Sequence, residues 1–303
     1  MGGTHIKYAF IKDSEFIYKN KLDTPKKDII EFIFKQINIS LEKENINYDD
    51  ILSVSLTIPG IIFKTGNATS INLGWENYPV LQEAKKIFKN KKIAILNDAK
   101  AAVYGEYVHG LKMEKPNVLM YTIGTGIGSG TIINKKLYLG NNTVIVGEVH
   151  GGGFQNIRDC KCGLGGCVEA VSGAQNIERI LNERKNDLML KDKELLKKDK
   201  ISIKDLRKEI LSGNQQIYNI FYESFLPLTD HMAVMIHMFD FDVIVIGGGV
   251  SKLGDYILKI IEKQIKNKIL KPYCDLLDLR LAKLQNDAGI IGVVEYSKNN
   301  LES

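Results

Sequence analysis

Short apolar runs alternate with amphipathic stretches along the chain, and this pattern predicts strands that alternate with helices. Residues 215–238 are apolar enough for one long helix, and residues 287–298 predict a terminal helix. The alternation places the chain in the α/β class. The predicted strands are residues 6–11, 51–58, 92–96, 117–123, 131–134 and 243–247.

The first helix is predicted from a start signal and an apolar stripe. Thr24 and Pro25 predict its N-cap and its first position. A threonine hydroxyl can accept a bond from the first turn, and proline has no N–H that would be left unpaired there. The stripe expected to face the core consists of Ile30, Ile33, Ile37 and Leu41.

Residues 183–208 are heavily charged, mixed in sign and free of aromatic side chains. This composition predicts a solvated helical excursion from the main fold. A segment that binds nucleic acid would need aromatic residues or charge of one sign, so we expect no such partner here.

Composition and charge narrow the class of protein further. The chain has 303 residues, of which 44% are hydrophobic and 25% charged, as in an ordinary globular protein of one large or two smaller domains. Its net charge of +5 is too small to indicate nucleic-acid binding. The start MGGTHIKYAF lacks a signal-peptide pattern, and no uncharged apolar run could span a bilayer. We therefore expect a cytoplasmic protein with no membrane partner.

Glycine turns occur at three strand ends. In GTGIGSG (residues 124–130), a strand precedes and another follows, so the backbone N–H groups could face phosphate oxygens. A plain hairpin turn is the equally weighted alternative. The turn in VIGGGVSK precedes a predicted helix start that could accept a nucleotide. The segment GGTHIKYAFI repeats the Gly-Thr turn, which suggests two similar domains facing each other across a cleft.

Asp98 follows a predicted buried strand and begins a helical pattern. Ligands of open α/β sheets bind beyond the carboxyl ends of strands, which favours a general base acting on a substrate hydroxyl. The alternative, favoured by position alone, is that Asp98 only caps the helix. Asn97 beside it could bind a neighbouring hydroxyl.

Three of the four cysteines gather in one glycine-rich loop. Cys160, Cys162 and Cys167, with His150 upstream, supply three sulfurs and one imidazole, which is a closed tetrahedral zinc set. Four protein ligands leave no open position, so a structural zinc is predicted. A redox pair would need the spacing C-x-x-C, which is absent. Cys274 stands apart and is predicted to be buried.

Two glutamates flank this loop, Glu148 before His150 and Glu169 after Cys167. A metal that fixes the loop would also fix these carboxylates, which accept hydrogen bonds from hydroxyl groups well. The alternative is that both are merely solvated.

These motifs together resemble the ROK family of sugar kinases (repressor, open reading frame, kinase) over nearly the whole chain. The cysteine pattern C-x-C-G-x-x-G-C-x-E, with its upstream histidine, is the most specific. The segments that carry the resemblance are GGTHIKYAFI, IPGIIFKTGNATSINLGW, LNDAKAA, GTGIGSG, GEVHGGGFQNIRDCKCGLGGCVEA, VIVIGGGVS and DAGIIG.

The resemblance implies an actin-like, hexokinase-type fold with two domains, ATP and Mg²⁺ in a cleft, and a structural zinc loop. The implied domains are residues 1–114 completed by the helix 286–303, and residues 115–285. Asp98 would be the catalytic base. The implied sugar ligands are Gly60, Asn72, Asn97, Asp98, Glu148, His150 and Glu169. The implied ATP ligands are Gly2, Gly3, Thr4, Gly124, Thr125, Gly126, Gly128 and Gly248.

Three positions depart from the family pattern. Leu96 stands where the family has an acidic residue, which we expect to be tolerated, and the motif around Glu148 and His150 is shortened. The family's first strand and its Asp before Gly-Gly-Thr are missing, because the chain begins at that turn. We therefore expect the natural chain to start upstream, and residues 6–11 to be the return arm of a hairpin. We also expect the chain as given to be poorly folded or nearly inactive.

The leading functional hypothesis is an ATP-dependent sugar kinase that acts on the 6-hydroxyl of N-acetylmannosamine, and glucokinase is the second. A sugar-responsive repressor of the same family is an alternative of another class, although a repressor would carry an additional helix-turn-helix domain. An inactive sugar-binding relic is the third. We expect a homodimer.

Overall fold

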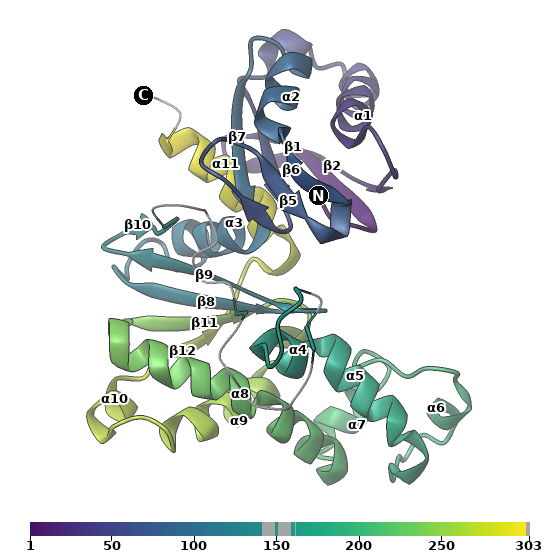
Figure 1. Ribbon diagram of the computed structural model, residues 1–303, viewed down its shortest axis with the longest axis vertical. Helices are drawn as coiled ribbons and strands as arrows, with labels where there is room; N and C mark the ends of the chain where they lie inside the picture. The colour runs from purple at the N-terminus through teal and green to yellow at the C-terminus, as the bar shows by residue number, and fades with distance from the viewer. Residues whose placement is uncertain (141–148, 151–158, 161, 301–303) are drawn as a thin grey trace. The chain divides into compact units, whose positions relative to one another are not determined.

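The computed structural model describes residues 1–140, 149–150, 159–160 and 162–300 (Figure 1). The chain packs as two compact units. Unit 1 consists of residues 1–114, 136–146 and 286–303, and unit 2 of residues 115–135 and 147–285. Each unit is an α/β assembly with its own apolar core. No helix among the described residues is long and apolar enough to cross a membrane.

The strands of unit 1 form three small sheets. One is the antiparallel hairpin of β1 (His5–Lys12) and β2 (Glu15–Asp23), and another is the parallel pair of β3 (Ser53–Ile58) and β7 (Lys92–Asn97). The third, antiparallel throughout, contains β4 (Ile61–Ile62), β5 (Ala68–Ser70) and β6 (Trp75–Tyr78). The strand β2 was not predicted, because its apolar and charged residues alternate at its exposed edge and give no buried run.

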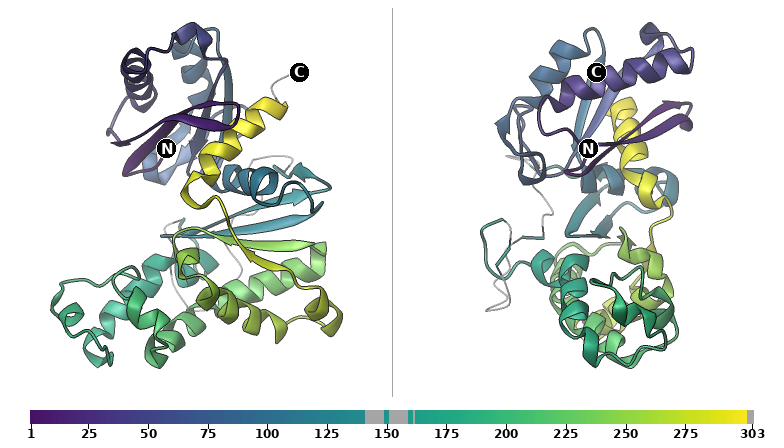
Figure 2. Two further views of the ribbon diagram at one scale, coloured as in Figure 1. Left: turned by 180° about the vertical axis from the view of Figure 1, so that it is seen from behind. Right: turned by 90° about the vertical axis from the view of Figure 1, so that its right-hand side faces the viewer.

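Helices α1 (Ile29–Lys43) and α2 (Val80–Ile87) pack with β3 and β7 around the core of unit 1. Helices α3 (Asp98–Gly105) and α11 (Ala288–Asn300) run side by side (Figure 2). Their contact depends on Gly292, where a Cβ atom would lie 1.7 Å from the carbonyl oxygen of Ala101. The remaining short elements are the strand β10 (Lys136–Leu137) and single turns at Tyr48–Asp50, Ile71–Leu73, Glu106–Gly110 and Gln285–Asp287.

The predicted start of the first helix is wrong. The helix begins at Ile29, and its N-cap is Asp28 with φ of 52°, not Thr24. Thr24 instead closes the hairpin, since its N–H donates to the carbonyl of Thr4 and its hydroxyl to that of Gly2. These bonds hold Thr24 at the end of the hairpin, five positions before the helix begins at Ile29. The predicted stripe is confirmed, with Ile30, Ile33 and Leu41 buried and Ile37 packed against the core.

Unit 2 contains a sheet in the order β9-β8-β11-β12. Its strands are β8 (Val118–Ile123), β9 (Ile127–Ile133), β11 (Val243–Gly247) and β12 (Leu279–Leu281), of which only β9 is antiparallel to its neighbour. Alternate residues of β8 and β11, such as Tyr121 and Ile246, enter the core formed with α8 and α9. Because β8 and β11 are parallel, their carboxyl ends lie at the same edge of the sheet.

The helices of unit 2 confirm the predicted long helix, which is α8. They are α4 (Val168–Ser172), α5 (Ala174–Glu183), α6 (Glu194–Lys197), α7 (Arg207–Leu211), α8 (Gln215–Phe239), α9 (Asp255–Lys266) and α10 (Lys271–Leu276), with short turns at Lys185–Asp187 and Val250–Leu253.

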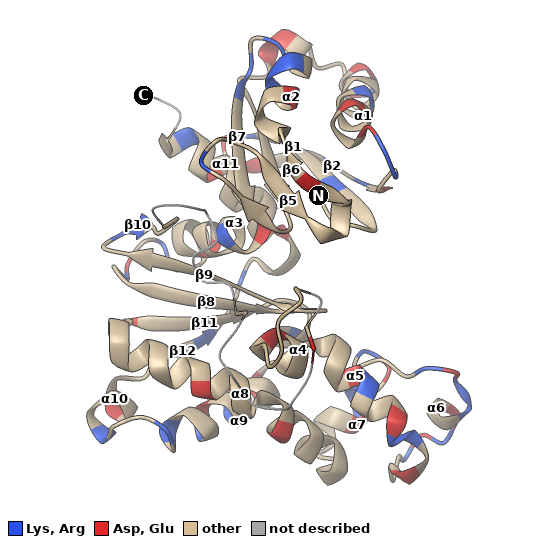
Figure 3. Cartoon of the chain, viewed as in Figure 1, with Lys and Arg blue, Asp and Glu red and all other residues tan. Residues whose placement is uncertain are grey.

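The prediction that residues 183–208 form a solvated helical excursion is wrong in part. Charges of both signs do lie along the segment (Figure 3). However, α6 is the one α-helix that lies wholly within it, and its apolar side chains enter the core of unit 2. The buried residues are Leu188, Leu190, Leu195, Ile201, Ile203 and Leu206. Their irregular spacing, which follows a winding backbone and not a helix, hid this burial from periodicity.

Candidate functional site

Asn97 and Asp98 stand at the carboxyl end of β7, where α3 begins. Asn97, which is buried, caps the helix: its Oδ1 accepts from the N–H groups of Ala99 at 2.9 Å and Lys100 at 3.2 Å. Asn97 Nδ2 donates to the carbonyl of Gly60 at 3.0 Å. The structure therefore brings Asn97 and Gly60 together, as two of the predicted sugar-binding positions.

Asp98 is not the N-cap, so the capping alternative does not explain it. Its side chain stays accessible to solvent although protein atoms crowd around it, and its Oδ1 accepts from the N–H of Ala99 at 2.9 Å. The surrounding protein removes enough water to raise the pKa of Asp98 above its ordinary value, although the Ala99 hydrogen bond opposes this. A carboxylate with a raised pKa accepts a proton more readily than an ordinary aspartate.

The Gly2–Thr4 turn of unit 1 lies against Asn72. A Cβ atom on Gly3 would be 2.6 Å from the carbonyl oxygen of Asn72, so the two backbones touch. Asn72 itself is exposed. The predicted phosphate turn and one predicted sugar residue are thus neighbours, and Gly60, with φ of 123°, is similarly close to the backbone of Thr69.

The second glycine turn, Gly124–Gly126, joins β8 to β9 as the predicted strand–turn–strand hairpin. The N–H of Gly124 donates to the carbonyl of Gly126 at 2.9 Å, and Thr125 is exposed at the tip. Gly128, predicted as part of the turn, belongs to β9, where its carbonyl accepts from the Thr122 hydroxyl at 3.2 Å.

Gly248, which follows β11, packs against this same turn. Its φ is 84°, and a Cβ atom would lie 2.5 Å from the carbonyl oxygen of Ile123, the residue before Gly124. The structure thus brings two of the predicted nucleotide turns together at one sheet edge. A short 3₁₀ turn, Val250–Leu253, follows the glycines, and α9 begins only at Asp255, so the predicted helix start is displaced.

The predicted metal ligands converge. Ligand atoms of His150, Cys160, Cys162 and Cys167 all lie within 4.8 Å of one another. The Sγ atoms of Cys162 and Cys167 are 3.6 Å apart, as are Cys160 Sγ and His150 Nδ1. Two ligands at about 2.3 Å from a tetrahedral zinc would be separated by about 3.7 Å, so these two separations and the donor set fit zinc.

The loop that carries the cysteines is built by tight turns. The N–H of Cys160 donates to the carbonyl of Leu164, and Gly163, with φ of 88°, donates back to Cys160. Cys160 and Cys167 are buried whereas Cys162 is exposed. Burial raises the pKa of the Cys160 thiol to about 12, so a cation bound there would have to displace its proton.

Glu169 is fixed by its surroundings and is not simply solvated. It stands in the first turn of α4, and its Oε2 accepts from the N–H of Ile127 at 3.0 Å. Glu148 lies outside the described residues. Cys274, predicted to be buried, is only half-buried, because α10 lies at the edge of the core; its Sγ is 3.5 Å from the carbonyl oxygen of Lys266.

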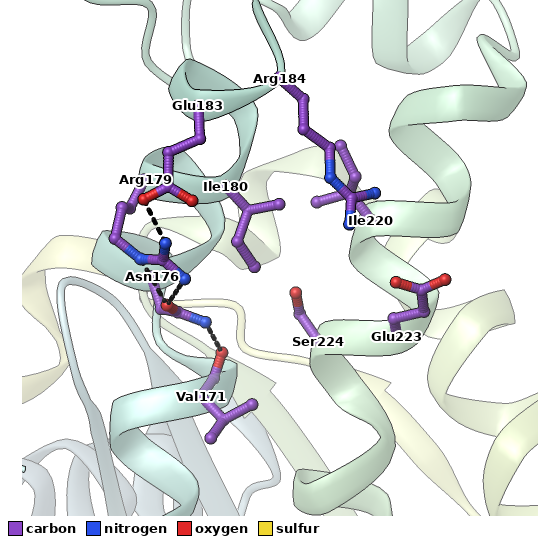
Figure 4. A pocket seen from close by; sticks show the side chains of 9 residues that line it. All are labelled: Val171, Asn176, Arg179, Ile180, Glu183, Arg184, Ile220, Glu223 and Ser224. Atoms are coloured by element: carbon purple, nitrogen blue, oxygen red, sulfur yellow. Dashed lines mark hydrogen bonds and ion pairs between the residues drawn. The ribbon is translucent and has the colours of Figure 1, made fainter. Parts of the chain in front are cut away.

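A hollow of about 310 Å³ between α5 and α8 was missed by sequence reasoning (Figure 4). Arg179 bonds both Asn176 Oδ1 and Glu183, while the buried Ser224 hydroxyl has no hydrogen-bond partner among the described residues. The remaining lining residues are Val171, Ile180, Arg184, Ile220 and Glu223. They come from helices far apart in the chain, so no local pattern indicates them.

The comparisons with known proteins agree with these motifs. The family model described as ROK family matches residues 1–299. The chain belongs to the ROK family. The α/β architecture is accordingly the actin-like ATPase fold of that family.

Two curated relatives cover almost the whole of this ROK chain. It is 31% identical to a glucokinase of Halalkalibacterium halodurans, over all of this chain and 95% of the relative. It is 26% identical to an N-acetylmannosamine kinase of Haemophilus influenzae, over 99% of this chain and 94% of the relative.

Two solved structures share the fold. A ROK family glucokinase from Streptomyces griseus, in complex with glucose and AMPPNP, has a TM-score of 0.81 at 22% identity and covers 99% of this chain and 98% of its own. A ROK family transcriptional regulator, a homolog of the E. coli MLC protein, has a TM-score of 0.85 at 20% identity and covers 98% of this chain and 76% of its own. At these identities the likeness concerns the fold.

Proposed function

We propose that this ROK protein is an ATP-dependent sugar kinase that phosphorylates the 6-hydroxyl of a hexose or an N-acetylhexosamine. The observation that carries the proposal is the position of Asp98, a solvent-accessible carboxylate with a raised pKa at the carboxyl end of a strand. Asn97 caps the helix, so Asp98 is not needed for that role. The two curated relatives described above are both sugar kinases, which supports the same conclusion.

Asp98 would act as the general base. Phosphoryl transfer depends mainly on the position of the attacking hydroxyl and on charge stabilisation at the phosphates. Asp98 Oδ2 would accept the hydroxyl proton, while Oδ1 stays on the Ala99 N–H and holds the carboxylate in place. Gly60, Asn72, Asn97, Glu148, His150 and Glu169 are proposed as the remaining sugar ligands.

The glycine turns would hold ATP and its Mg²⁺. Gly124, Thr125 and Gly126 present a turn without bulky side chains, and Gly248 lies beside it at the carboxyl end of β11. Backbone N–H groups of such turns bind phosphate oxygens. Gly2, Gly3, Thr4 and Gly128 are proposed as further ATP ligands, and the two units as the two domains of the kinase.

A zinc ion held by His150, Cys160, Cys162 and Cys167 would have a structural role, because all four positions are filled by protein. When bound, it supplies a cross-link that fixes the loop. The chain's own residues then present Glu169 from α4 in a fixed orientation.

The choice between the two sugars rests on similarity alone. The glucokinase relative is 31% identical and the N-acetylmannosamine kinase relative 26%, so both sugars stay candidates for the substrate. We also expect a homodimer, which light scattering on the purified protein would test.

A coupled assay of ADP release over a panel of sugars tests the proposal. We expect turnover with glucose or N-acetylmannosamine, however slow it is in the chain as given, and turnover about 10²–10⁴-fold slower with Asp98→Asn. Tight sugar binding without ADP release would favour the regulator, since a regulator of this fold is known, or an inactive sugar-binding protein. Absence of both sugar binding and ADP release would contradict the proposal.

A further inference from the structure

The carboxylate of Glu169 touches the glycine turn that is proposed to hold ATP. Glu169 Oε2 accepts from the N–H of Ile127 at 3.0 Å. The same oxygen lies so close to Gly126 that a Cβ atom there would be 2.1 Å from it. The carboxylate therefore packs against the turn at a position where only glycine leaves room for it.

The segment that carries Glu169 holds the turn at further points. The N–H of Ala174 donates to the carbonyl of Gly124 at 2.8 Å, and that of Gln175 to Thr125 at 3.2 Å. Gly173 joins the two groups of contacts, since its own N–H donates to the carbonyl of Glu169 at 3.0 Å. Movement of α4 would consequently move the turn.

The second carboxylate oxygen faces the cysteine cluster. Glu169 Oε1 lies 3.9 Å from Cys160 Sγ, one of the proposed metal ligands. One side chain thus connects the cysteine loop to the glycine turn. A carboxylate offers about four lone-pair positions, so Glu169 can accept from Ile127 and from a further hydroxyl at once.

We propose that Glu169 is a positioning residue that couples sugar binding to nucleotide binding, an inference that rests on the proposed kinase function. A sugar hydroxyl on Oε1 would further restrain the carboxylate in the orientation that already accepts from the Ile127 N–H, and would so restrain the turn for the nucleotide. The second ligand would find the side chain already ordered, so the coupling is positive. By thermodynamic linkage it is reciprocal: the nucleotide raises sugar affinity by the same factor.

Two variants of equal charge isolate this contact. Glu169→Gln keeps an oxygen that can accept from Ile127, whereas Glu169→Ala does not. In the absence of sugar, titration calorimetry with Mg²⁺ and AMPPNP should give a Kd about three- to tenfold weaker for Glu169→Ala than for Glu169→Gln, the range expected for one hydrogen bond. Both variants should raise the KM for sugar, so the nucleotide Kd separates the two roles of Glu169.

Hydrogen exchange gives a readout that needs no nucleotide. Amide exchange across residues 124–128 should be faster in Glu169→Ala than in Glu169→Gln or the unsubstituted protein. Glu223→Ala, which removes an exposed glutamate of α8 in the same unit, is the matched control and should leave this exchange unchanged.

Equal nucleotide affinity and equal exchange in the two Glu169 variants would overturn the proposal. If the unsubstituted protein binds no Mg²⁺–AMPPNP at all, the kinase function fails instead. Without nucleotide binding there is no coupling between the two ligands, but the exchange data still decide whether Glu169 holds the turn. Circular dichroism must show both variants folded. If Glu169→Ala is not, Glu169→Asp, whose shorter carboxylate reaches Ile127 less well, replaces it and is compared with the unsubstituted protein, which has the same charge.

Discussion

Asp98 and Glu169 are both acidic residues in the first turn of a helix, but different interactions place them. Asp98 follows directly from β7, and the side chain of its neighbour Asn97 fixes the helix start. Glu169 depends on Ile127, 42 positions earlier, and on a cysteine loop that converges on a metal site. The position of Asp98 is set by its neighbours in the sequence, whereas the position of Glu169 requires the folded cysteine loop. Substitutions in that loop should therefore affect Glu169, and substitutions beside Asp98 should affect Asp98.

The largest expected effect comes from Asp98→Asn. The amide cannot accept the hydroxyl proton, so turnover should fall by about 10²–10⁴-fold, while nucleotide affinity changes little. Steady-state kinetics of ADP release with saturating sugar would measure the loss. Turnover close to that of the unsubstituted protein would remove Asp98 from the role of base.

The next largest effect is expected in the loop that supports Glu169. Purified protein should contain one zinc per chain by elemental analysis, and Cys162→Ser should weaken metal binding by about 10–100-fold or more. The KM for sugar should then rise more than the KM for ATP, because Glu169 would lose support on its Oε1 side.

Cys274→Ser is the matched control, because Cys274 lies on α10, away from the cluster. It should leave both zinc content and sugar affinity unchanged. Stoichiometric zinc in a protein that lacks both Cys160 and Cys162 would show that the metal binds elsewhere.

The same contrast explains what could be predicted from the sequence. The strand before Asp98 and the spacing of the metal ligands are local patterns, and both β7 and the convergence of the four ligands were predicted. The roles of these residues stay predictions. The contact between Glu169 and Ile127 was missed, because a backbone N–H is present at every position and leaves no sign in the residue types.

Two predictions failed where tertiary contacts override local preference. Thr24 and Pro25 carry a strong helix-start signal, yet Thr24 is used to close the hairpin of β1 and β2. Residues 183–208 have the charge of a solvated segment, yet their leucines and isoleucines extend the core of unit 2. In both cases the partner that decides the structure lies far away in the sequence, so no window of neighbouring residues contains it.

A smaller effect is expected from Asn97→Ala, which tests local placement directly. Loss of the bonds to Ala99 and Lys100 should lower the free energy of unfolding by about 1 kcal/mol, the usual cost of removing an N-cap. Asn97→Ser keeps a neutral capping oxygen and should recover part of that stability, but not the bond to the Gly60 carbonyl. Thermal unfolding of the pair would measure both, and equal stability of Asn97→Ala and the unsubstituted protein would contradict local capping.

The smallest expected effect is the pH dependence that Asp98 gives to stability. Desolvation raises the pKa of Asp98 in the folded protein above its value in the unfolded chain, near 3.9. The folded state therefore binds this proton more tightly, so the contribution of Asp98 is fully present below about pH 3.9 and is lost as pH rises through the folded pKa. At pH 7 the charged carboxylate is slightly destabilising, and Asp98→Asn should melt slightly higher than the unsubstituted protein. The difference should shrink as the pH approaches 4, because the carboxyl then becomes neutral as well. A melting temperature of Asp98→Asn that is lower at pH 7, or a difference that grows toward pH 4, would mean that the folded protein stabilises the charged form of Asp98 and holds its pKa below the ordinary value.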